Sequence, residues 1–172
     1  MIVREATPND AAGIARAHID VWRTTYGSIV PDDYLASLSY EARERRWRQM
    51  LESPADPTFV FVAEDDRQVI GFAAGGRERT GEAAVTGELA AIYVRDEWQG
   101  QGVGRELARA VVARLQADGH RAMLVWVLAA NAGARRFYEA LGGRPERARP
   151  VEIAGLTLDE VGYVWPDLSG LV

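Results

Sequence analysis

A glycine-rich turn, Gln99-Gly100-Gln101-Gly102-Val103-Gly104, constrains this chain more than any other feature of its sequence. The residues before the turn, 84–94, have the apolar, β-prone character of a strand. The residues after it predict a helix from about residue 102 to about residue 117, because apolar side chains recur at helical spacing at Val103, Leu107, Val111 and Leu115. The turn therefore joins a strand to the start of a helix.

A helix that begins beside glycines offers a site for an anion. The first amides of a helix have no partner within it, and the helix dipole makes this end positive. Glycines at 100, 102 and 104 would let the backbone approach a phosphate. A flexible connection is the plain alternative, because such a glycine pattern is weak evidence alone. A P-loop is excluded because no Gly-Lys-Ser/Thr follows, and Arg105 stands where a dinucleotide fingerprint needs glycine.

The remaining sequence predicts blocks of helices and strands. Apolar residues at helical spacing, with proline, acidic residues or serine at the starts, predict helices at residues 8–24, from 31, at 40–51 and at 131–141. Runs of β-prone residues between turn signals predict strands at residues 2–4, 58–63, 68–74, 121–128, 149–153 and 157–165. The order β-α-α-(α)-β-β-β-α-β-α-β-β indicates a mixed sheet with helices on both sides, in the α/β or α+β class, within one domain over residues 1–172.

The composition excludes several kinds of site. The chain has no cysteine, so disulfides, a cysteine nucleophile and thiolate metal sites are excluded. With only His18 and His120, we expect no metal site of the zinc type. Asp and Glu outnumber Lys and Arg by 25 to 20, and the net charge of −5 does not suggest a surface that binds nucleic acid.

The ends of the chain and its apolar runs bear on location. The N-terminus mixes charges into its first residues and has no secretory signal pattern. The longest apolar run, residues 123–130, is too short to span a bilayer. We therefore expect a cytoplasmic protein without a membrane partner. The closing hairpin and an edge strand could support a homodimer, although the sequence does not show the interface.

Two segments resemble motifs of the GNAT N-acetyltransferase superfamily. In the first, residues 88–104, the family pattern Gln/Arg-x-x-Gly-x-Gly/Ala is matched by Gln99, Gly102 and Gly104. An apolar-aromatic-Val triplet precedes it as Ile92-Tyr93-Val94. The second segment, residues 131–143, follows at the expected distance and contains Asn131 and Tyr138. The resemblance covers residues 58–165 and implies an acetyl-CoA-dependent enzyme with a mostly antiparallel mixed sheet.

The resemblance also implies a role for each matching residue. The backbone of Ile92–Val94 would pair, strand-like, with the pantetheine of acetyl-CoA. The amides that follow Gln99 would hold the pyrophosphate, at Gly100, Gln101, Gly102, Val103, Gly104 and Arg105. Asn131 would hydrogen-bond the cofactor, and Tyr138 would protonate the departing thiolate. The strands at 84–94 and 121–128 would splay apart into a V that holds the thioester.

Direct transfer in a ternary complex is the mechanism that we expect, because neither a cysteine nor a Gly-x-Ser-x-Gly elbow is present. An alkyl amine with a pKa of about 10.4 must lose a proton before it attacks. Glu88 is our candidate base, because in an ideal strand it shares a face with Val94, although a bulge would change that parity. A solvated carboxylate is the alternative reading. Glu82 is a weaker candidate, and water could also accept the proton. The Val94 amide could stabilise the oxyanion.

The acceptor site is harder to read. The predicted substrate contacts are Trp22 and Tyr26 at the end of the first helix, together with Glu88 and Trp126, and Tyr34 is a further candidate. Plain core aromatics are the alternative for Trp22 and for Tyr138. His18 lies on an apolar face and is expected to be a core histidine.

Three functions remain open at this point. The first is acetylation of a primary amine of a small molecule or a peptide N-terminus. The second is a non-catalytic acyl-CoA-binding regulatory module on the same fold. The third is a nucleotide-binding module that uses the same turn. The presence of Tyr138 favours the enzyme.

Overall fold

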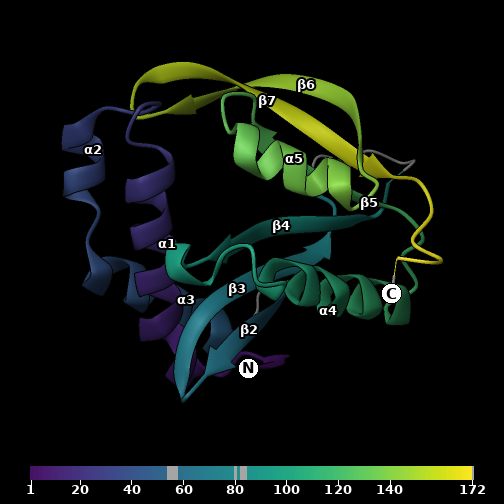
Figure 1. Cartoon of the computed structure of the whole chain (residues 1–172), viewed down its shortest axis with the longest axis horizontal. Helices are drawn as coiled ribbons and strands as arrows, with labels where there is room; N and C mark the ends of the chain where they lie inside the picture. Colours follow the sequence, from purple (N-terminus) through teal and green to yellow (C-terminus); the bar gives the residue numbers. More distant parts are fainter. Residues whose placement is uncertain (54–57, 80, 82–84, 172) are drawn as a thin grey trace.

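The computed structural model describes residues 1–53, 58–79, 81 and 85–171, and a seven-stranded sheet forms its centre (Figure 1). The strands are arranged in the order β1-β2-β3-β4-β5-β7-β6. Their bounds are Ile2–Glu5, Phe59–Asp65, Gln68–Arg77, Gly87–Val94, Met123–Leu128, Arg144–Ile153 and Leu156–Trp165 for β1 to β7. Neighbouring strands are antiparallel except β4 and β5, which are parallel. This confirms the predicted mixed, mostly antiparallel sheet.

Helices cover both faces of the sheet (Figure 1). Their bounds are Ala11–Thr25, Asp32–Ser37, Tyr40–Glu52, Val103–Ala117 and Ala132–Ala140 for α1 to α5, with 3-10 turns η1 at Pro8–Asp10 and η2 at Asp96–Trp98. α1 and α3 pack against β2 and β3 on one face, and α4 and α5 pack on the other. None of the helices in the described residues is long and apolar enough to cross a membrane.

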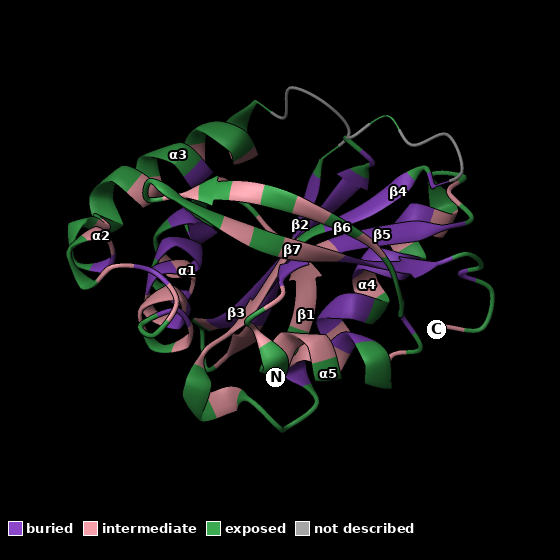
Figure 2. Ribbon diagram, turned by 90° about the horizontal axis from the view of Figure 1, so that it is seen from above, coloured by how far each residue is buried: buried purple, intermediate pink, exposed green. Residues whose placement is uncertain are grey.

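The core follows the predicted apolar spacing. The four residues expected on the inner side of α4 are all at most 1% exposed, namely Val103, Leu107, Val111 and Leu115. They pack with β-strand residues and with α5 in one large cluster. Figure 2 shows the buried residues gathered in the central strands, whereas the part of the β6–β7 hairpin near its turn is exposed or half-buried. The helix that the sequence predicted after the glycine turn is therefore confirmed.

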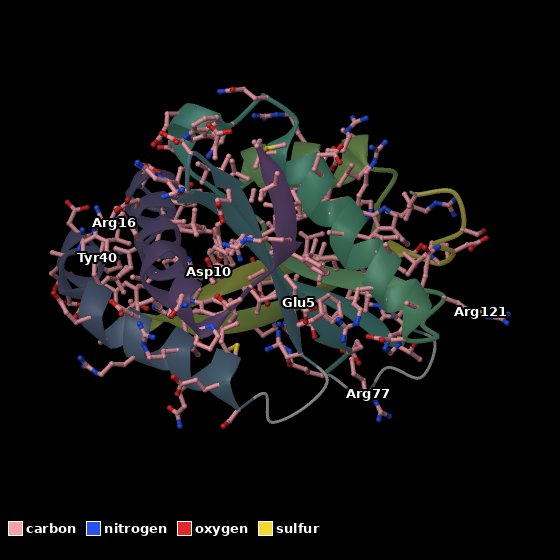
Figure 3. All side chains as sticks on the ribbon, turned by 90° about the horizontal axis from the view of Figure 1, so that it is seen from below. Glu5, Asp10, Arg16, Tyr40, Arg77 and Arg121 are labelled. Carbon is pink, nitrogen blue, oxygen red and sulfur yellow. The ribbon has the colours of Figure 1, made fainter. Side chains whose placement is uncertain are left out.

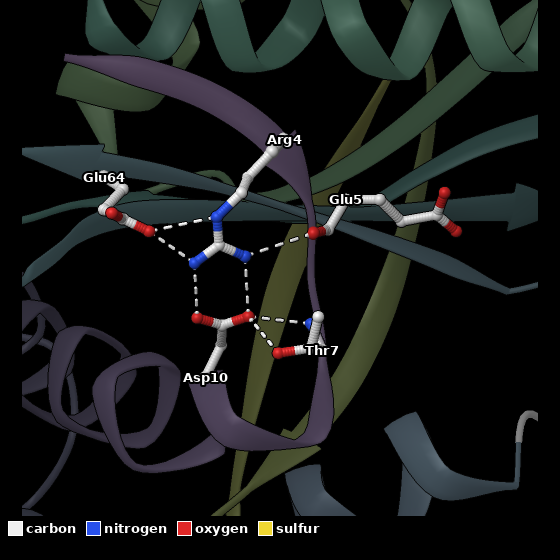
Figure 4. Close-up of polar contacts among 5 residues, drawn as sticks. All are labelled: Arg4, Glu5, Thr7, Asp10 and Glu64. Atoms are coloured by element: carbon white, nitrogen blue, oxygen red, sulfur yellow. Dashed lines mark hydrogen bonds and ion pairs between the residues drawn. The ribbon is translucent and has the colours of Figure 1, made fainter. Parts of the chain in front are cut away.

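A polar network holds the start of α1 against the sheet (Figure 4). The Arg4 guanidinium on β1 donates to both oxygens of Asp10 at 2.8 Å and also binds Glu64 on β2. The Thr7 amide donates to Asp10 at 2.7 Å. The hydrogen bond from Arg4 is the main reason that the pKa of Asp10 falls to about 2. The network therefore fixes the helix whose far end reaches the acceptor side.

A second contact ties the outer helices together at Tyr40, whose side chain is labelled in Figure 3. The Tyr40 hydroxyl at the start of α3 donates to Asp20 on α1 at 2.5 Å and accepts from Arg23 at 3.0 Å. Arg23 also donates to the carbonyls of Leu35 and Leu38, at 3.3 and 3.0 Å. α1, α2 and α3 are therefore joined near the residues that were expected to contact the acceptor.

The sheet opens between β4 and β5. These strands pair at Gly87 with Met123 and at Glu88 with Leu124, and then diverge. A β-bulge lies in the same strand, because Ala74 faces Ala91 while Gly75 faces Leu89, so that Ala90 is the extra residue. The opening agrees with the V that the family resemblance implied.

The bulge changes which side chains of β4 share a face. Leu89, Ile92 and Val94 all pack in the cluster with α4, so Glu88 points to the opposite face. In an unbroken strand Glu88 and Val94 would point the same way. The shared face was expected for an ideal strand only, and the bulge that would change the parity is present, with Ala90 as the extra residue.

Candidate active site

A cavity of about 790 Å³ lies where β4 and β5 part. Its walls come from residues 90–94 of β4, the glycine turn and the start of α4, β5, the start of α5, the end of α1 and the β6–β7 hairpin. This volume lies within the range of small-molecule and cofactor sites. The cavity therefore joins the segments that the sequence had singled out separately.

The glycine turn opens one part of this cavity. Gly100 and Gly102 adopt positive φ angles of 71° and 87°, and Gly102 is the residue that precedes α4. A side chain at either position would strain the backbone. Gly104 lies under the Phe137 ring, which an added Cβ would approach to 3.2 Å. The turn thus presents backbone rather than side chains to the cavity.

The predicted residues of the turn divide into two groups. Gln99, Gly100, Gly102, Gly104 and Arg105 line the cavity. Gln101 and Val103 do not line it. The side-chain Nε2 of Gln101 donates to the Glu97 carbonyl at 2.8 Å, and Val103 is buried in the core.

Gln99 acts on the turn through its side chain. Its Nε2 donates to the Val94 carbonyl at 3.0 Å and to Asp96 at 2.9 Å. These bonds hold the turn against the end of β4. The side chain therefore organises the backbone of the turn.

The end of β4 supplies backbone to the same cavity. β5 pairs with β4 no further than Glu88 in the described residues, so the edge of Ile92–Val94 faces the cavity without a neighbouring strand. The Tyr93 ring points away and stacks on His18 with 4.9 Å between the ring centroids. Its hydroxyl accepts a hydrogen bond from Trp22 Nε1 at 3.1 Å. Such an edge can pair with an extended ligand.

The histidine on α1 belongs to the core, as expected. The His18 ring lies against Tyr93, Phe72 and Trp47, and its Nδ1 is buried without a hydrogen-bond partner among the described residues. Burial, assisted by the nearby Arg43 and Arg46, lowers the pKa of His18 to about 3. The ring is therefore neutral at ordinary pH.

α5 contributes Asn131 and Tyr138. The Asn131 side chain caps the helix by accepting from the Ala134 amide at 3.0 Å, and its Nδ2 donates to the Tyr26 hydroxyl at 3.2 Å. Tyr138 is 5% exposed and lines the cavity, and its hydroxyl has no hydrogen-bond partner in the described part of the chain. Burial is the main reason that the pKa of Tyr138 lies above its usual value. The phenol therefore keeps its proton and can donate it.

The predicted acceptor residues are partly brought together. Trp22, Tyr26 and Trp126 line the cavity, whereas Tyr34 packs behind Trp22 with 6.5 Å between the ring centroids. Glu82, the weaker candidate base, lies outside the described residues.

Glu88 lies elsewhere. It is 3% exposed, it does not line the cavity, and it forms a two-point ion pair with Arg79 at 2.7 and 2.9 Å. The bulge at Ala90 puts this carboxylate on the face opposite Ile92 and Val94, and there Arg79 binds both of its oxygens outside the cavity lining. This placement does not support Glu88 as the group that takes a proton from the acceptor.

The cavity contains one acidic residue that the sequence reading missed. Glu160 on β7 lines it, and Arg149 on β6 donates from Nε to Glu160 Oε2 at 2.7 Å. The sequence did carry a signal for Glu160, because this acidic residue interrupts the apolar character of the strand at 157–165. Its location was not readable, because nothing local in the sequence says that β7 pairs with β5.

Comparisons with known proteins agree with this arrangement. The sequence model of the Acetyltransferase (GNAT) family matches residues 15–143. The uncharacterized N-acetyltransferase YuaI of Bacillus subtilis is 44% identical over 172 residues, which cover 98% of this chain and 95% of that protein.

Solved structures show the same fold. The structure of yncA from Salmonella typhimurium with its cofactor acetyl-CoA matches with a TM-score of 0.73 at 23% identity, covering 98% of this chain and 94% of that one. The PaiA N-acetyltransferase of Thermoplasma acidophilum, in complex with coenzyme A, matches with a TM-score of 0.73 at 19% identity, covering 92% and 96%. The chain therefore belongs to the GNAT family and is an acetyltransferase.

Proposed function

We propose that this protein transfers the acetyl group of acetyl-CoA directly to a primary amine of a small molecule or a peptide N-terminus. The observation that carries this proposal is the joint cavity of the glycine turn, the free edge of β4 and the Tyr138 hydroxyl. The cofactors named for yncA and PaiA support the choice of donor. A cytoplasmic location and a homodimer stay predictions from the sequence.

The donor would lie along the V. The pyrophosphate would accept hydrogen bonds from the amides of residues 100–105, where the α4 dipole and the Arg105 side chain both favour negative charge. The pantetheine amides would pair with the backbone of Ile92–Val94. Asn131 would contribute its side chain at the start of α5. The thioester would then lie beside Tyr138.

The transfer needs one bond to form and one to break. The neutral amine attacks the thioester carbonyl carbon, and the oxyanion that results accepts a hydrogen bond from the Val94 amide. The carbon–sulfur bond then breaks. The Tyr138 hydroxyl gives its proton to the departing thiolate, and solvent returns a proton to the phenolate. No acyl-enzyme is needed, which agrees with the absence of cysteine.

Water is the proposed proton acceptor for the attacking amine. Glu88 forms an ion pair with Arg79 and is buried outside the cavity, so its carboxylate does not face the space where the acceptor amine would lie. Since an alkyl amine has a pKa of about 10.4, the rate should rise with pH through the neutral range as the neutral amine becomes more abundant.

The first prediction concerns Tyr138→Phe. We expect the release of free thiol from acetyl-CoA, measured with a panel of primary amines, to fall about a hundredfold in kcat, because general acid catalysis contributes at least that much. The affinity for CoA, measured by calorimetry, should stay close to that of the wild type. An unchanged kcat would remove Tyr138 from the mechanism.

Glu88→Gln is the matched control in the same assay. It is a conservative change outside the cavity, and once circular dichroism shows that the variant is folded we expect its kcat to stay within a few-fold of the wild type. A hundredfold loss would instead return Glu88 to the role of base. CoA binding without thiol release for any amine would favour a regulatory module, and stronger protection against melting by NAD or ATP than by CoA would favour a nucleotide-binding module.

A further inference from the structure

The cavity wall carries two charges of opposite sign. Among the described residues that line it, Arg105 and Glu160 are the charged ones. Arg105 follows the glycine turn on α4, and Glu160 lies on β7. The positive residue belongs with the phosphates of the proposed donor, whereas no step of the proposed transfer uses the negative one.

Glu160 lies on the acceptor side of the sheet. It stands directly opposite Leu128 in the β5–β7 pair, and residues opposite one another in an antiparallel pair point to the same face. Leu128 packs against Tyr26 and the end of α1, whereas Val127, next to it in β5, packs with Tyr138. Glu160 and Tyr138 therefore act on opposite faces of the opening.

The carboxylate is held in place but keeps one oxygen available. Arg149 donates from Nε to Oε2, and its guanidinium lies 4.0 Å from the centre of the Trp126 ring. The Glu160 side chain is 14% exposed. Its Oε1 has no hydrogen-bond partner within the described residues. Trp126 and Tyr26 line the same cavity, so its wall carries aromatic surface together with an oriented acceptor of hydrogen bonds.

A fixed carboxylate beside aromatic rings is a site for an ammonium group. The carboxylate supplies a charge-assisted hydrogen bond, and the aromatic rings attract a cation. Glu160 lies on the opposite face of the opening from Tyr138, beside which the thioester is proposed to lie, so the group that it binds is not the acetylated nitrogen itself. The ammonium must therefore belong to another part of the acceptor.

We infer that Glu160 selects acceptors that carry a second ammonium group besides the amine that is acetylated, as in a diamine. This inference rests on the proposed function. Glu160 binds the charged end on the face of Trp126 and Tyr26, while the neutral end reaches through the V to the thioester. Arg149 is a positioning residue, because it orients the carboxylate and packs on Trp126.

The test compares two acceptors with the same reacting group, 1,4-diaminobutane and butylamine. We expect the kcat/KM of the wild type to be about tenfold or more higher for the diamine than for butylamine. A hydrogen bond to a charged group contributes enough free energy to change an equilibrium constant by about that factor. In Glu160→Gln this ratio should fall by about tenfold. Glutamine keeps the size of the side chain and an acceptor for Arg149, so only the charge is lost.

Asp159→Asn is the matched control. Asp159 is the neighbouring acidic residue on β7, it is exposed, and strand alternation points it to the other face. This variant should keep the wild-type ratio. Melting temperatures of both variants show whether the change in Glu160 acts on stability rather than on selectivity.

Two outcomes would overturn the inference, namely equal kcat/KM for both amines in the wild type, or an unchanged ratio in Glu160→Gln. The absence of turnover with either amine would instead count against the proposed function. Calorimetric binding of 1,4-diaminobutane in the presence of CoA then decides the role of Glu160. Binding that is lost in Glu160→Gln supports it, and equal binding, or none in the wild type, contradicts it.

Discussion

At the scale of single residues, burial among aromatic rings sets the pKa of His18. His18 is enclosed by rings, and burial lowers its pKa from 6.5 to about 3. The unfolded chain binds a proton at this residue below about pH 6.5, whereas the folded protein does so only near pH 3. Lowering the pH through this window therefore favours the unfolded state.

His18→Phe tests this argument. At pH 5 the histidine should cost the wild type about 2 kcal/mol of stability relative to pH 7.5, because a shift of one pKa unit corresponds to about 1.4 kcal/mol. Phenylalanine fits a site made of aromatic rings and does not titrate, so the variant should lose about 2 kcal/mol less over the same interval. Urea unfolding at both pH values measures the difference. Equal losses in the two proteins would show that His18 does not titrate as inferred.

At the scale of elements, a change at the start of α4 should reduce CoA affinity, whereas an equivalent change at its end should reduce only stability. Gly102 precedes this helix with φ 87°, and Gly119 follows it with φ 88°, and a Cβ would meet no atom within 4 Å at either position. Alanine should therefore cost each site a similar backbone strain of about 1–2 kcal/mol. Of these two glycines, Gly102 borders the proposed pyrophosphate site and Gly119 does not.

We therefore expect Gly102→Ala to weaken CoA binding at least tenfold in a calorimetric titration, because strain would move the amides that face the phosphates. Gly119→Ala, at the other end of the same helix, should bind CoA like the wild type. Urea unfolding should show similar losses of stability in both. Equal CoA affinities would mean that the turn does not hold the phosphates.

The elements also show what a sequence can predict here. The apolar stripe of α4 was readable because helical spacing is local, and the glycine turn was readable because it needs special backbone angles. A bulge in β4 was considered, but its position at Ala90 was not readable, because the register depends on pairing with β3. This bulge moved Glu88 off the face expected for an ideal strand. The position of Glu160 in the cavity was not predicted for the same reason, since it follows from the pairing of β7 with β5.

At the scale of the whole molecule, the sheet has two parts that meet weakly along their backbones. In the described residues β4 and β5 share two residue pairs, whereas side chains from both parts join in the cluster beneath α4 and α5. A bound donor would lie between the parts. At a CoA concentration of one hundred times Kd, the folded state should gain about 2.7 kcal/mol.

Hydrogen–deuterium exchange can locate this effect. CoA should slow exchange in residues 92–105 and at the start of α5, where the backbone would contact the donor. The tip of the β6–β7 hairpin at Ala154 and Gly155 should exchange as before. Protection spread evenly over the molecule, or confined to the hairpin, would contradict the proposed position of the donor.

The interrupted sheet has a further consequence for the life of the protein in a cell. If the donor completes the hydrogen bonding along β4, then between turnovers this strand is left with an exposed edge, and proteases cut chains mainly when local structure opens. Bound acetyl-CoA would then protect this part of the chain from cleavage as well as serve as the donor.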